Sequence, residues 1–286
     1  MNSCNDWILL TGGSVNSVFK KGNVIRRKLT AASPAIHQLL EYLAAQNLTC
    51  VPRLIDRDKN YEYLSYFPGE SITRPWCEAV KTDEFIAQLG EWLKDYHNAI
   101  ADFELEGDAK FNWGVSQPQQ DMIVCHGDLG PWNCIQQNGN FQGIIDWDLA
   151  KYGYVVDNIA EFIFEFIPFR PNLQKTMGEK VSDKVLFKRL ETFCKAYQYI
   201  EPDEIIKHIP IYLTLMNKEL SNYFWGDRIS TNASLAKLDT ANLEAQRQGL
   251  IAQKEQAAVL AQLKNCARTD TNGTHRIIPG QIVAKK

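Results

Sequence analysis

The sequence lacks any long apolar run, because no segment approaches the ~18 uninterrupted apolar residues that a membrane-spanning helix needs. The best candidate, IAEFIFEFIPF, is interrupted by Glu161 and Glu165. The first residues, MNSCNDWILLTGG, also lack the basic start and apolar stretch of a secretory signal. We therefore expect a cytoplasmic protein with no membrane partner.

The sequence also lacks a large excess of positive or negative charge. The chain has 31 Lys and Arg against 34 Asp and Glu, a net charge of −3, so nothing indicates nucleic acid as a partner. Its 7 cysteines are scattered and form no CxxC pair. Metal-binding cysteines are closely spaced, so this pattern favours reduced, mostly buried thiols. No internal repeat or low-complexity tract is present.

The first third of the chain has the pattern of a small sheet with one helix. Residues 7–29 alternate and carry β-branched residues, which predicts two or three short strands. A helix should follow, with Ser33 as its cap and Pro34 at its first position. Residues 51–56 and 61–67 read as two further strands.

Beyond a turn at residues 68–70 the chain is mostly helical. The one clear β signal is a hairpin at Asn138-Gly139, where both turn positions need a positive φ. Apolar periodicity predicts helices over residues 82–98, 157–167, 183–198, 203–225 and 234–264. A small β-rich lobe followed by a larger helical lobe is the organisation that these patterns favour.

Three polar side chains should meet beside the hairpin, next to the stretch VCHGDLGPWNCI. A two-residue turn pairs Asn133 with Ile144, and Asp146 then lies two residues further, about 7 Å along the strand. Asp128 lies on the loop that enters the same end of the hairpin. A carboxylate and a carboxamide oxygen suit Mg²⁺. A second carboxylate can orient a hydroxyl and accept its proton.

The segments HGDLGPWN and IIDWD resemble the catalytic machinery of the protein-kinase-like phosphotransferases. Gly127 after the histidine, and Ile-Asp-Trp where protein kinases have Asp-Phe-Gly, are similar to the aminoglycoside phosphotransferase branch. The stretches SYFPGE, LGEWLKDYHN and YGYVVDNIAEF also resemble that family, as its hinge, a helix ending in His, and its structural Asp. The resemblance covers residues 10–165.

This resemblance implies a bilobal α+β fold and transfer of the γ-phosphoryl group of ATP or GTP, with Mg²⁺, to a hydroxyl of a small molecule. The acceptor would be of the aminoglycoside, amino alcohol or sugar type. Asp128 would be the catalytic residue, and Asn133 and Asp146 would hold the metal. The implied parts are a nucleotide-binding lobe (1–64), a hinge (65–71), a catalytic and helical lobe (72–265) and a tail (266–286).

The nucleotide-binding residues follow the family pattern less closely. Small residues at Gly13 and Ser14 would let backbone N–H groups approach phosphate. In the third strand, alternation puts Arg26 and Lys28 on one face and Arg27 on the other, and the resemblance favours Arg26 as the phosphate-binding cation. The backbone of Ser65, Tyr66 and Phe67 would contact the purine.

The position of the family's helix glutamate, the expected partner of that cation, holds His37, with Glu41 one turn later. The sequence therefore leaves open which residue pairs with the cation. It also leaves open the identity of the acceptor, the choice between ATP and GTP, and the oligomeric state.

Several further acids and one histidine have predicted roles. His126 should hold the catalytic loop, and Asp157 should be a buried acceptor for backbone N–H groups near it. Asp148 is a candidate for a second metal or the substrate. Glu161 and Glu165 share a helix face with Asp157 and could meet a cationic acceptor at the mouth of the cleft.

Two other classes of function remain open. One is a nucleotide-binding regulatory module that has lost transfer activity. The other is an interaction protein whose helix over residues 234–264 recruits a partner, with the kinase-like fold as its scaffold.

Overall fold

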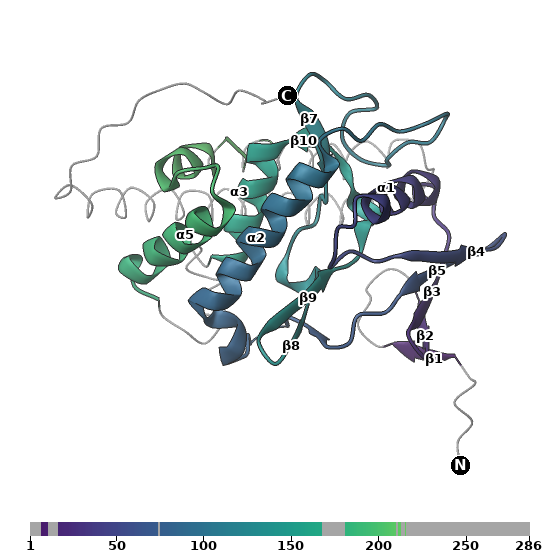
Figure 1. The fold of residues 1–286 in the computed structure, drawn as a ribbon, viewed down its shortest axis with the longest axis horizontal. Helices are drawn as coiled ribbons and strands as arrows, with labels where there is room; N and C mark the ends of the chain where they lie inside the picture. The colour runs from purple at the N-terminus through teal and green to yellow at the C-terminus, as the bar shows by residue number, and fades with distance from the viewer. Residues whose placement is uncertain are drawn as a thin grey trace, which may run out of the picture.

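The fold is taken from a computed structural model, described over residues 7–10, 17–73, 75–167, 181–209, 211–212 and 215. The first lobe is built on a 5-stranded antiparallel sheet of order β1-β2-β3-β5-β4 (Figure 1). Its strands are β1 (Ile8–Leu10), β2 (Val18–Lys21), β3 (Val24–Lys28), β4 (Leu54–Arg57) and β5 (Tyr61–Ser65). The predicted strands of this lobe are confirmed.

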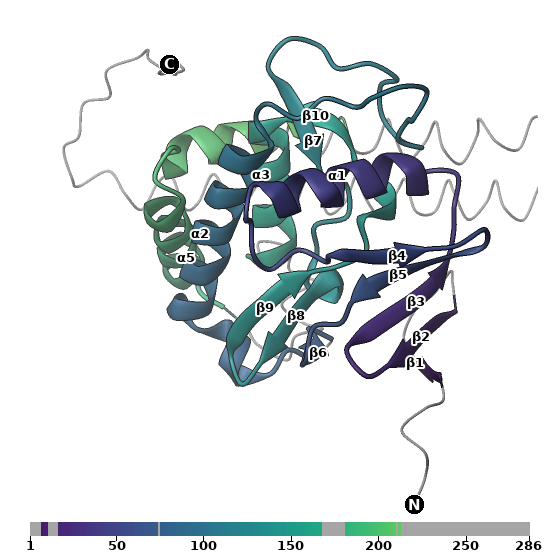
Figure 2. The same ribbon diagram turned by 45° about the vertical axis from the view of Figure 1, so that its right-hand side comes forward.

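Helix α1 (Ser33–Ala45) lies alongside β4 and completes the lobe (Figure 2). Pro34 stands in its first turn, where a missing N–H costs nothing. Ser33 is inside the helix rather than capping it, and its Oγ accepts a hydrogen bond from the Thr30 N–H at 2.9 Å. The buried apolar residues of the helix are Ala35, Ile36, Leu39, Leu40 and Leu43, and Ser33 and His37 are buried with them.

The second lobe is mainly helical. It contains α2 (Asp83–Ile100), α3 (Val155–Phe166) and α5 (Asp183–Tyr197), with short 3₁₀ turns η1 (Glu78–Lys81), η2 (Pro131–Asn133) and η3 (Trp147–Leu149). Thr82 caps α2 by accepting the Phe85 N–H at 3.2 Å. The predicted helices over 82–98, 157–167 and 183–198 are confirmed. Of the next one, only residues up to 209, 211–212 and 215 are described, and 234–264 and 266–286 lie outside the described residues.

Two small sheets carry the loops between these helices. Strands β6 (Glu70–Ser71), β8 (Cys134–Gln137) and β9 (Asn140–Ile144) form one, and β7 (Met122–Cys125) pairs with β10 (Lys151–Tyr154) in the other. The strands β7 and β10 were not predicted. The chain crosses between the lobes after β5 and joins the β8–β9 hairpin through β6, within the segment expected to be the hinge.

The hairpin turn is as predicted, but its register is not. Asn138 and Gly139 have φ values of 53° and 79°, as a two-residue turn requires. A bulge between Ile135 and Gln136 then shifts the pairing by one residue, so that Cys134 rather than Asn133 faces Ile144. Asn133 instead accepts the Ile145 N–H through its carbonyl, at 2.9 Å.

The described cysteines, Cys50, Cys77, Cys125, Cys134 and Cys194, are all free thiols. This agrees with the scattered pattern of cysteines in the sequence. Within the part of the chain that the structure describes, no helix is both long enough and apolar enough to cross a bilayer.

Candidate active site

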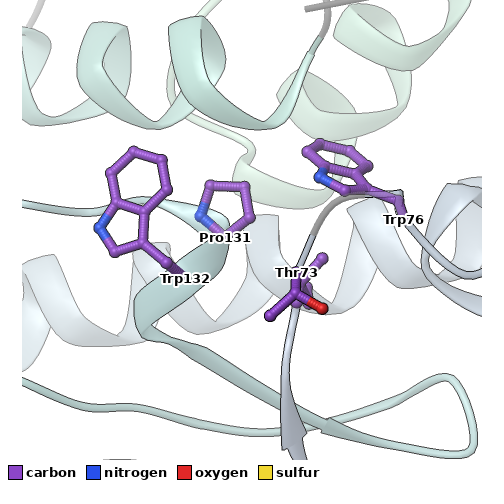
Figure 3. A pocket seen from close by; sticks show the side chains of 5 residues that line it. Thr73, Trp76, Pro131 and Trp132 are labelled. Atoms are coloured by element: carbon purple, nitrogen blue, oxygen red, sulfur yellow. The ribbon is translucent and has the colours of Figure 1, made fainter. Parts of the chain in front are cut away.

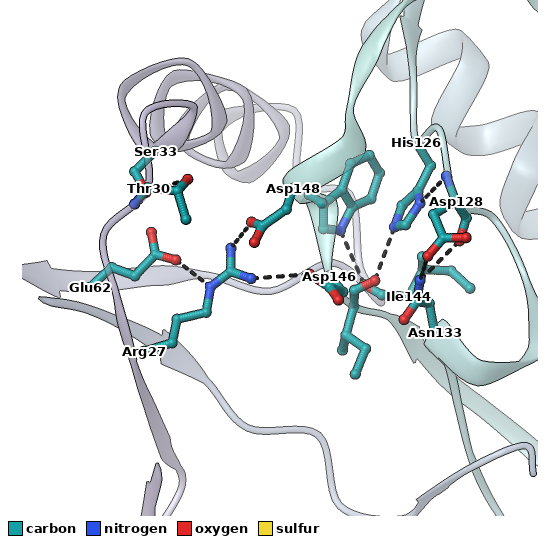
Figure 4. A network of polar contacts seen from close by, with 12 residues as sticks. Arg27, Thr30, Ser33, Glu62, His126, Asp128, Asn133, Ile144, Asp146 and Asp148 are labelled. Carbon is teal, nitrogen blue, oxygen red and sulfur yellow. Dashed lines mark hydrogen bonds and ion pairs between the residues drawn. The ribbon is translucent and has the colours of Figure 1, made fainter. Parts of the chain in front are cut away.

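Asp128 and Asn133 are locked together on the loop that follows β7. The Asn133 Nδ2 group donates to Asp128 Oδ2 at 2.8 Å and to the Asp128 carbonyl at 2.9 Å (Figure 4). Trp132 Nε1 donates to the same Asp128 Oδ2 at 3.0 Å. Burial raises the pKa of Asp128, and the hydrogen bonds from Trp132 and Asn133 act against that rise. One oxygen of the carboxylate is therefore fixed by two donors.

The glycine of His-Gly-Asp is required by the backbone. Gly127 has φ +80°, and a Cβ placed on it would lie 1.9 Å from the Leu149 carbonyl oxygen. Only glycine allows the catalytic loop and the segment after Asp146 to approach so closely.

We expect Gly127→Ala to destabilise the protein by about 2–4 kcal/mol, because a left-handed backbone and a clash with a backbone carbonyl add together. Gly107→Ala is the matched control, since Gly107 has φ +65° but nothing within 4 Å of the added Cβ. It should cost only about 1 kcal/mol. Urea unfolding of both variants measures the difference, and equal losses would contradict the proposed close approach.

His126 joins this loop to the segment that carries Asp146. Its Nδ1 accepts the Asp128 N–H at 3.3 Å, so Nε2 carries the proton and donates to the Ile145 carbonyl at 3.0 Å. Its ring packs edge-on against Trp147, with centroids 4.5 Å apart. Burial lowers the pKa of His126 to about 4, so the ring is neutral at pH 7. These contacts favour a structural role.

Asp146 stands in a left-handed conformation, with φ 63° and ψ 68°, directly before η3. Such a conformation in a residue other than glycine is typical of functional sites. The next residue, Trp147, is buried and donates its indole N–H to the Ile144 carbonyl at 3.2 Å. Trp147 thus anchors the turn, while the Asp146 side chain remains 52% exposed.

A buried arginine faces these acids from the first lobe. Arg27, on β3, places Nη1 3.2 Å from Asp146 Oδ1 and Nη2 2.7 Å from Asp148 Oδ1, and its Nε pairs with Glu62 (Figure 4). Burial lowers the pKa of Arg27, but the charges of Asp148, Glu62 and Asp146 outweigh it and raise the pKa overall. Both lobes meet at this ion-pair cluster.

Arg26, which the sequence favoured as the phosphate-binding cation, points to the other face of the sheet. Its guanidinium lies 4.5 Å from the ring centroid of Trp7, 4.9 Å from that of Phe19 and 5.0 Å from that of Tyr61. Alternation correctly separated Arg26 from Arg27, but it could not say which face turns toward the site.

The acidic residues of α3 are placed differently from the prediction. Glu161 is 8% exposed and accepts the Leu129 N–H at 3.3 Å and the Asn158 Nδ2 group at 3.1 Å. Burial raises its pKa to about 7. Glu161 therefore supports the catalytic loop from inside instead of lining the mouth of a cleft. Asp157, expected in that supporting role, pairs with His208 at 2.6 Å, and Glu165 is half-buried.

The predicted nucleotide-binding segments are only partly available. The N–H of Ser65 donates to the Arg53 carbonyl and that of Tyr66 to the Asn23 carbonyl, both at 2.9 Å. These two N–H groups are already used within the first lobe, so a purine contact by a backbone N–H of this segment falls to Phe67. Gly13 and Ser14 lie outside the described residues.

The site offers oxygen donors that suit Mg²⁺. Because Nδ2 of Asn133 makes both of that side chain's contacts with Asp128, Oδ1 is the atom left for a metal ion. Asp146 supplies a carboxylate. In the described ranges no cluster of three or more His, Cys, Asp or Glu side chains could hold a metal by itself. Two oxygen donors of this kind suit an ion that completes its coordination with phosphate oxygens and water.

A pocket of about 450 Å³ opens at Pro131 and Trp132, on the loop that also carries Asp128 (Figure 3). Its lining residues are Ile72, Thr73, Trp76, Pro131 and Trp132. Trp132 contributes to both features, since its ring lines the pocket while its N–H holds the Asp128 carboxylate. A molecule in this pocket would contact the ring whose N–H is bonded to that carboxylate.

Comparison with known proteins agrees with this geometry. Residues 112–177, which include the catalytic loop and Asp146, match the model of the phosphotransferase enzyme family (APH). A trifolitoxin immunity protein from Rhizobium leguminosarum bv. trifolii is 31% identical over 152 residues, which cover 51% of this chain and 56% of that protein. The match therefore spans little more than half of that relative's length.

Two solved structures share the fold at low identity. An ethanolamine kinase from Plasmodium vivax is 12% identical with a TM-score of 0.58, covering 91% of this chain and 84% of its own. The ADP-bound aminoglycoside phosphotransferase APH(2'')-Ib is 13% identical with a TM-score of 0.53, covering 91% and 96%. The chain thus shares the protein-kinase-like fold of these enzymes, and its residues 112–177 are similar to the phosphotransferase enzyme family.

Proposed function

We propose that this protein transfers the γ-phosphoryl group of ATP or GTP to a hydroxyl of a small molecule. The observation that carries the proposal is the linkage of two acids. Asp128 is held by Asn133 on one loop, and His126 ties that loop to the residue before Asp146. Phosphoryl transfer needs such positioned charges more than covalent chemistry by the protein.

Each residue then has a distinct task. Two donors fix Asp128 Oδ2, so Oδ1 orients the acceptor hydroxyl and takes its proton as the oxygen bonds to the γ-phosphorus and the bond to the β-phosphate oxygen breaks. Asn133 Oδ1 and Asp146 would hold Mg²⁺. The bound ion neutralises charge on the β- and γ-phosphates.

Arg27 takes the role of the phosphate-binding cation that the sequence favoured for Arg26. Its guanidinium is on the face of β3 that meets Asp146 and Asp148, whereas Arg26 is held among aromatic rings on the opposite face. A planar guanidinium contacts two phosphate oxygens at once.

The pocket at Pro131 and Trp132 is the proposed acceptor site. Its described lining is aromatic and apolar apart from Thr73 and carries no charge. The predicted acidic surface for a cationic acceptor is not supplied by Glu161, which is buried. Of the acceptor classes considered from the sequence, an alcohol carried on a ring that stacks against Trp132, such as a sugar, fits this lining best.

The direct test is to incubate the protein with Mg²⁺, ATP or GTP, and aminoglycosides, amino alcohols, sugars or nucleosides. We expect one class to yield a phosphomonoester and nucleoside diphosphate in equal amounts. Binding of Mg-nucleotide without transfer to any acceptor or to water would favour the regulatory module instead.

Trp132→Phe should reduce turnover and shift the acidic limb of the rate profile to higher pH. The change removes one of two donors that lower the pKa of Asp128, so its pKa rises and the base form is lost at a higher pH. A hydrogen bond to a charged group contributes about 1.5–3 kcal/mol, so we expect a loss of about tenfold or more on the acidic limb of the profile.

Trp76→Phe is the matched control for Trp132→Phe, because Trp76 lines the same pocket while its Nε1 has no partner among the described residues. It should leave the pH profile unchanged, although the acceptor KM can change. The same pH shift in both variants would contradict the role of the Trp132 N–H.

A further inference from the structure

Glu62, which pairs with the proposed phosphate-binding residue Arg27, lies on strand β5. The family pattern places the corresponding glutamate on the helix. We propose that Glu62, fixed by His37, is the positioning residue for Arg27 and weakens its competition with Mg²⁺ for Asp146. This inference rests on the proposed function, because it assigns a task to the residues behind the same nucleotide site.

Glu62 is built to hold Arg27 in one place. It lies on β5 directly opposite Arg27 on β3, and its side chain is only 1% exposed. Its two oxygens have different partners: Oε1 pairs with Arg27 Nε, and Oε2 lies 2.5 Å from His37 Nε2. A rotation that frees one oxygen breaks the other contact, so the carboxylate has a single favoured orientation.

The contacts of His37 determine its tautomer. Arg57 Nη1 lies 3.2 Å from His37 Nδ1. A guanidinium can only donate, so Nδ1 must accept and Nε2 must carry the proton. His37 is therefore a neutral donor to Glu62. Helix α1 supplies a hydrogen bond, and strand β5 supplies the negative charge that the family pattern places on the helix.

The nitrogens of the Arg27 guanidinium therefore have two kinds of partner. Glu62 takes Nε, whereas Nη1 and Nη2 contact Asp146 and Asp148. Those two nitrogens are the ones that phosphate oxygens would take when Asp146 turns to the metal. Without the Glu62 charge, Arg27 is left with Asp146 and Asp148 as its described anionic partners, and it would compete more strongly with Mg²⁺ for Asp146.

The test is Glu62→Gln, with ADP titrated at several Mg²⁺ concentrations in the absence of any acceptor. We expect at least about a tenfold loss of Mg-ADP affinity, because one partner of a buried charge pair is removed. The loss should shrink as Mg²⁺ is raised, which a general loss of folding would not produce. Glu41→Gln, at an exposed acid on helix α1, is the control and should bind as the wild type does.

Two further variants separate charge from hydrogen bonding. His37→Gln keeps an N–H donor and should bind within about threefold of the wild type, whereas His37→Leu removes the donor and should lose more. His37→Leu also keeps both charges of the pair, so it provides the same test if Glu62→Gln melts too low to titrate.

The outcomes distinguish this inference from the proposed function. Wild-type Mg-ADP affinity and Mg²⁺ dependence in both Glu62→Gln and His37→Leu would overturn the inference while leaving transfer intact. A wild-type protein that binds Mg-nucleotide but transfers nothing would overturn the proposed function, and the role of Glu62 in binding would stand.

Discussion

Asp128→Asn is expected to lower turnover by about 10²–10⁴-fold, the range of a general base. Asparagine keeps the shape of the side chain, and its carbonyl oxygen can still accept from Trp132 and Asn133. What is lost is the negative charge that orients the acceptor hydroxyl and receives its proton. Because the nucleotide is held by other residues, Mg-nucleotide affinity should be nearly unchanged.

The control for Asp128→Asn is Asp121→Asn, an exposed acid just before β7. Asp121 has φ 64°, which asparagine also tolerates, so the variant tests loss of charge nearby without a change in backbone. It should transfer phosphate at the wild-type rate. Unchanged turnover in Asp128→Asn would contradict the phosphotransferase mechanism and favour the regulatory module.

Asp146→Asn should act on binding. Asparagine accommodates the φ of 63° at this position, so the turn before η3 should persist. The lost carboxylate is the proposed charged donor for Mg²⁺, and even the outer partners of a metal site contribute about tenfold or more to affinity. We therefore expect at least a tenfold loss of Mg-dependent nucleotide binding, measured by titration over a range of Mg²⁺ concentrations.

Asp148→Asn is the control for Asp146→Asn, because both acids contact Arg27 but only Asp146 is assigned to the metal. It should weaken the Arg27 contact and change the Mg²⁺ dependence less. If Asp148→Asn showed the larger loss of Mg²⁺ dependence, the metal assignment would move to Asp148.

The fold was predictable where local signals are strong. The Asn138-Gly139 pair predicted the hairpin because few other residue pairs adopt two successive positive φ values. The apolar stripe of α2 predicted a helix in the same way. The strands β7 and β10 were missed because each has 4 residues and the pairs form far apart in sequence, as between Val124 and Tyr152.

The candidate site was predictable in its motif and less so in its surroundings. The spacing of Asp128, Asn133 and Asp146 identified one cluster. The choice of Arg27 over Arg26 depends on which sheet face packs inward, and the one available signal was a glutamate in the neighbouring strand, Glu62. Asp157 and Glu161 lie one turn apart on α3, and their different contacts likewise depend on how the helix packs, which the sequence does not reveal.

The most direct test of this account is nucleotide titration with and without Mg²⁺ on the wild type, Asp128→Asn and Asp146→Asn. It separates two acids that composition cannot distinguish. We predict that Mg²⁺ strengthens binding in the wild type and in Asp128→Asn but not in Asp146→Asn. Equal losses of binding in the two variants would contradict the division into a base and a metal ligand.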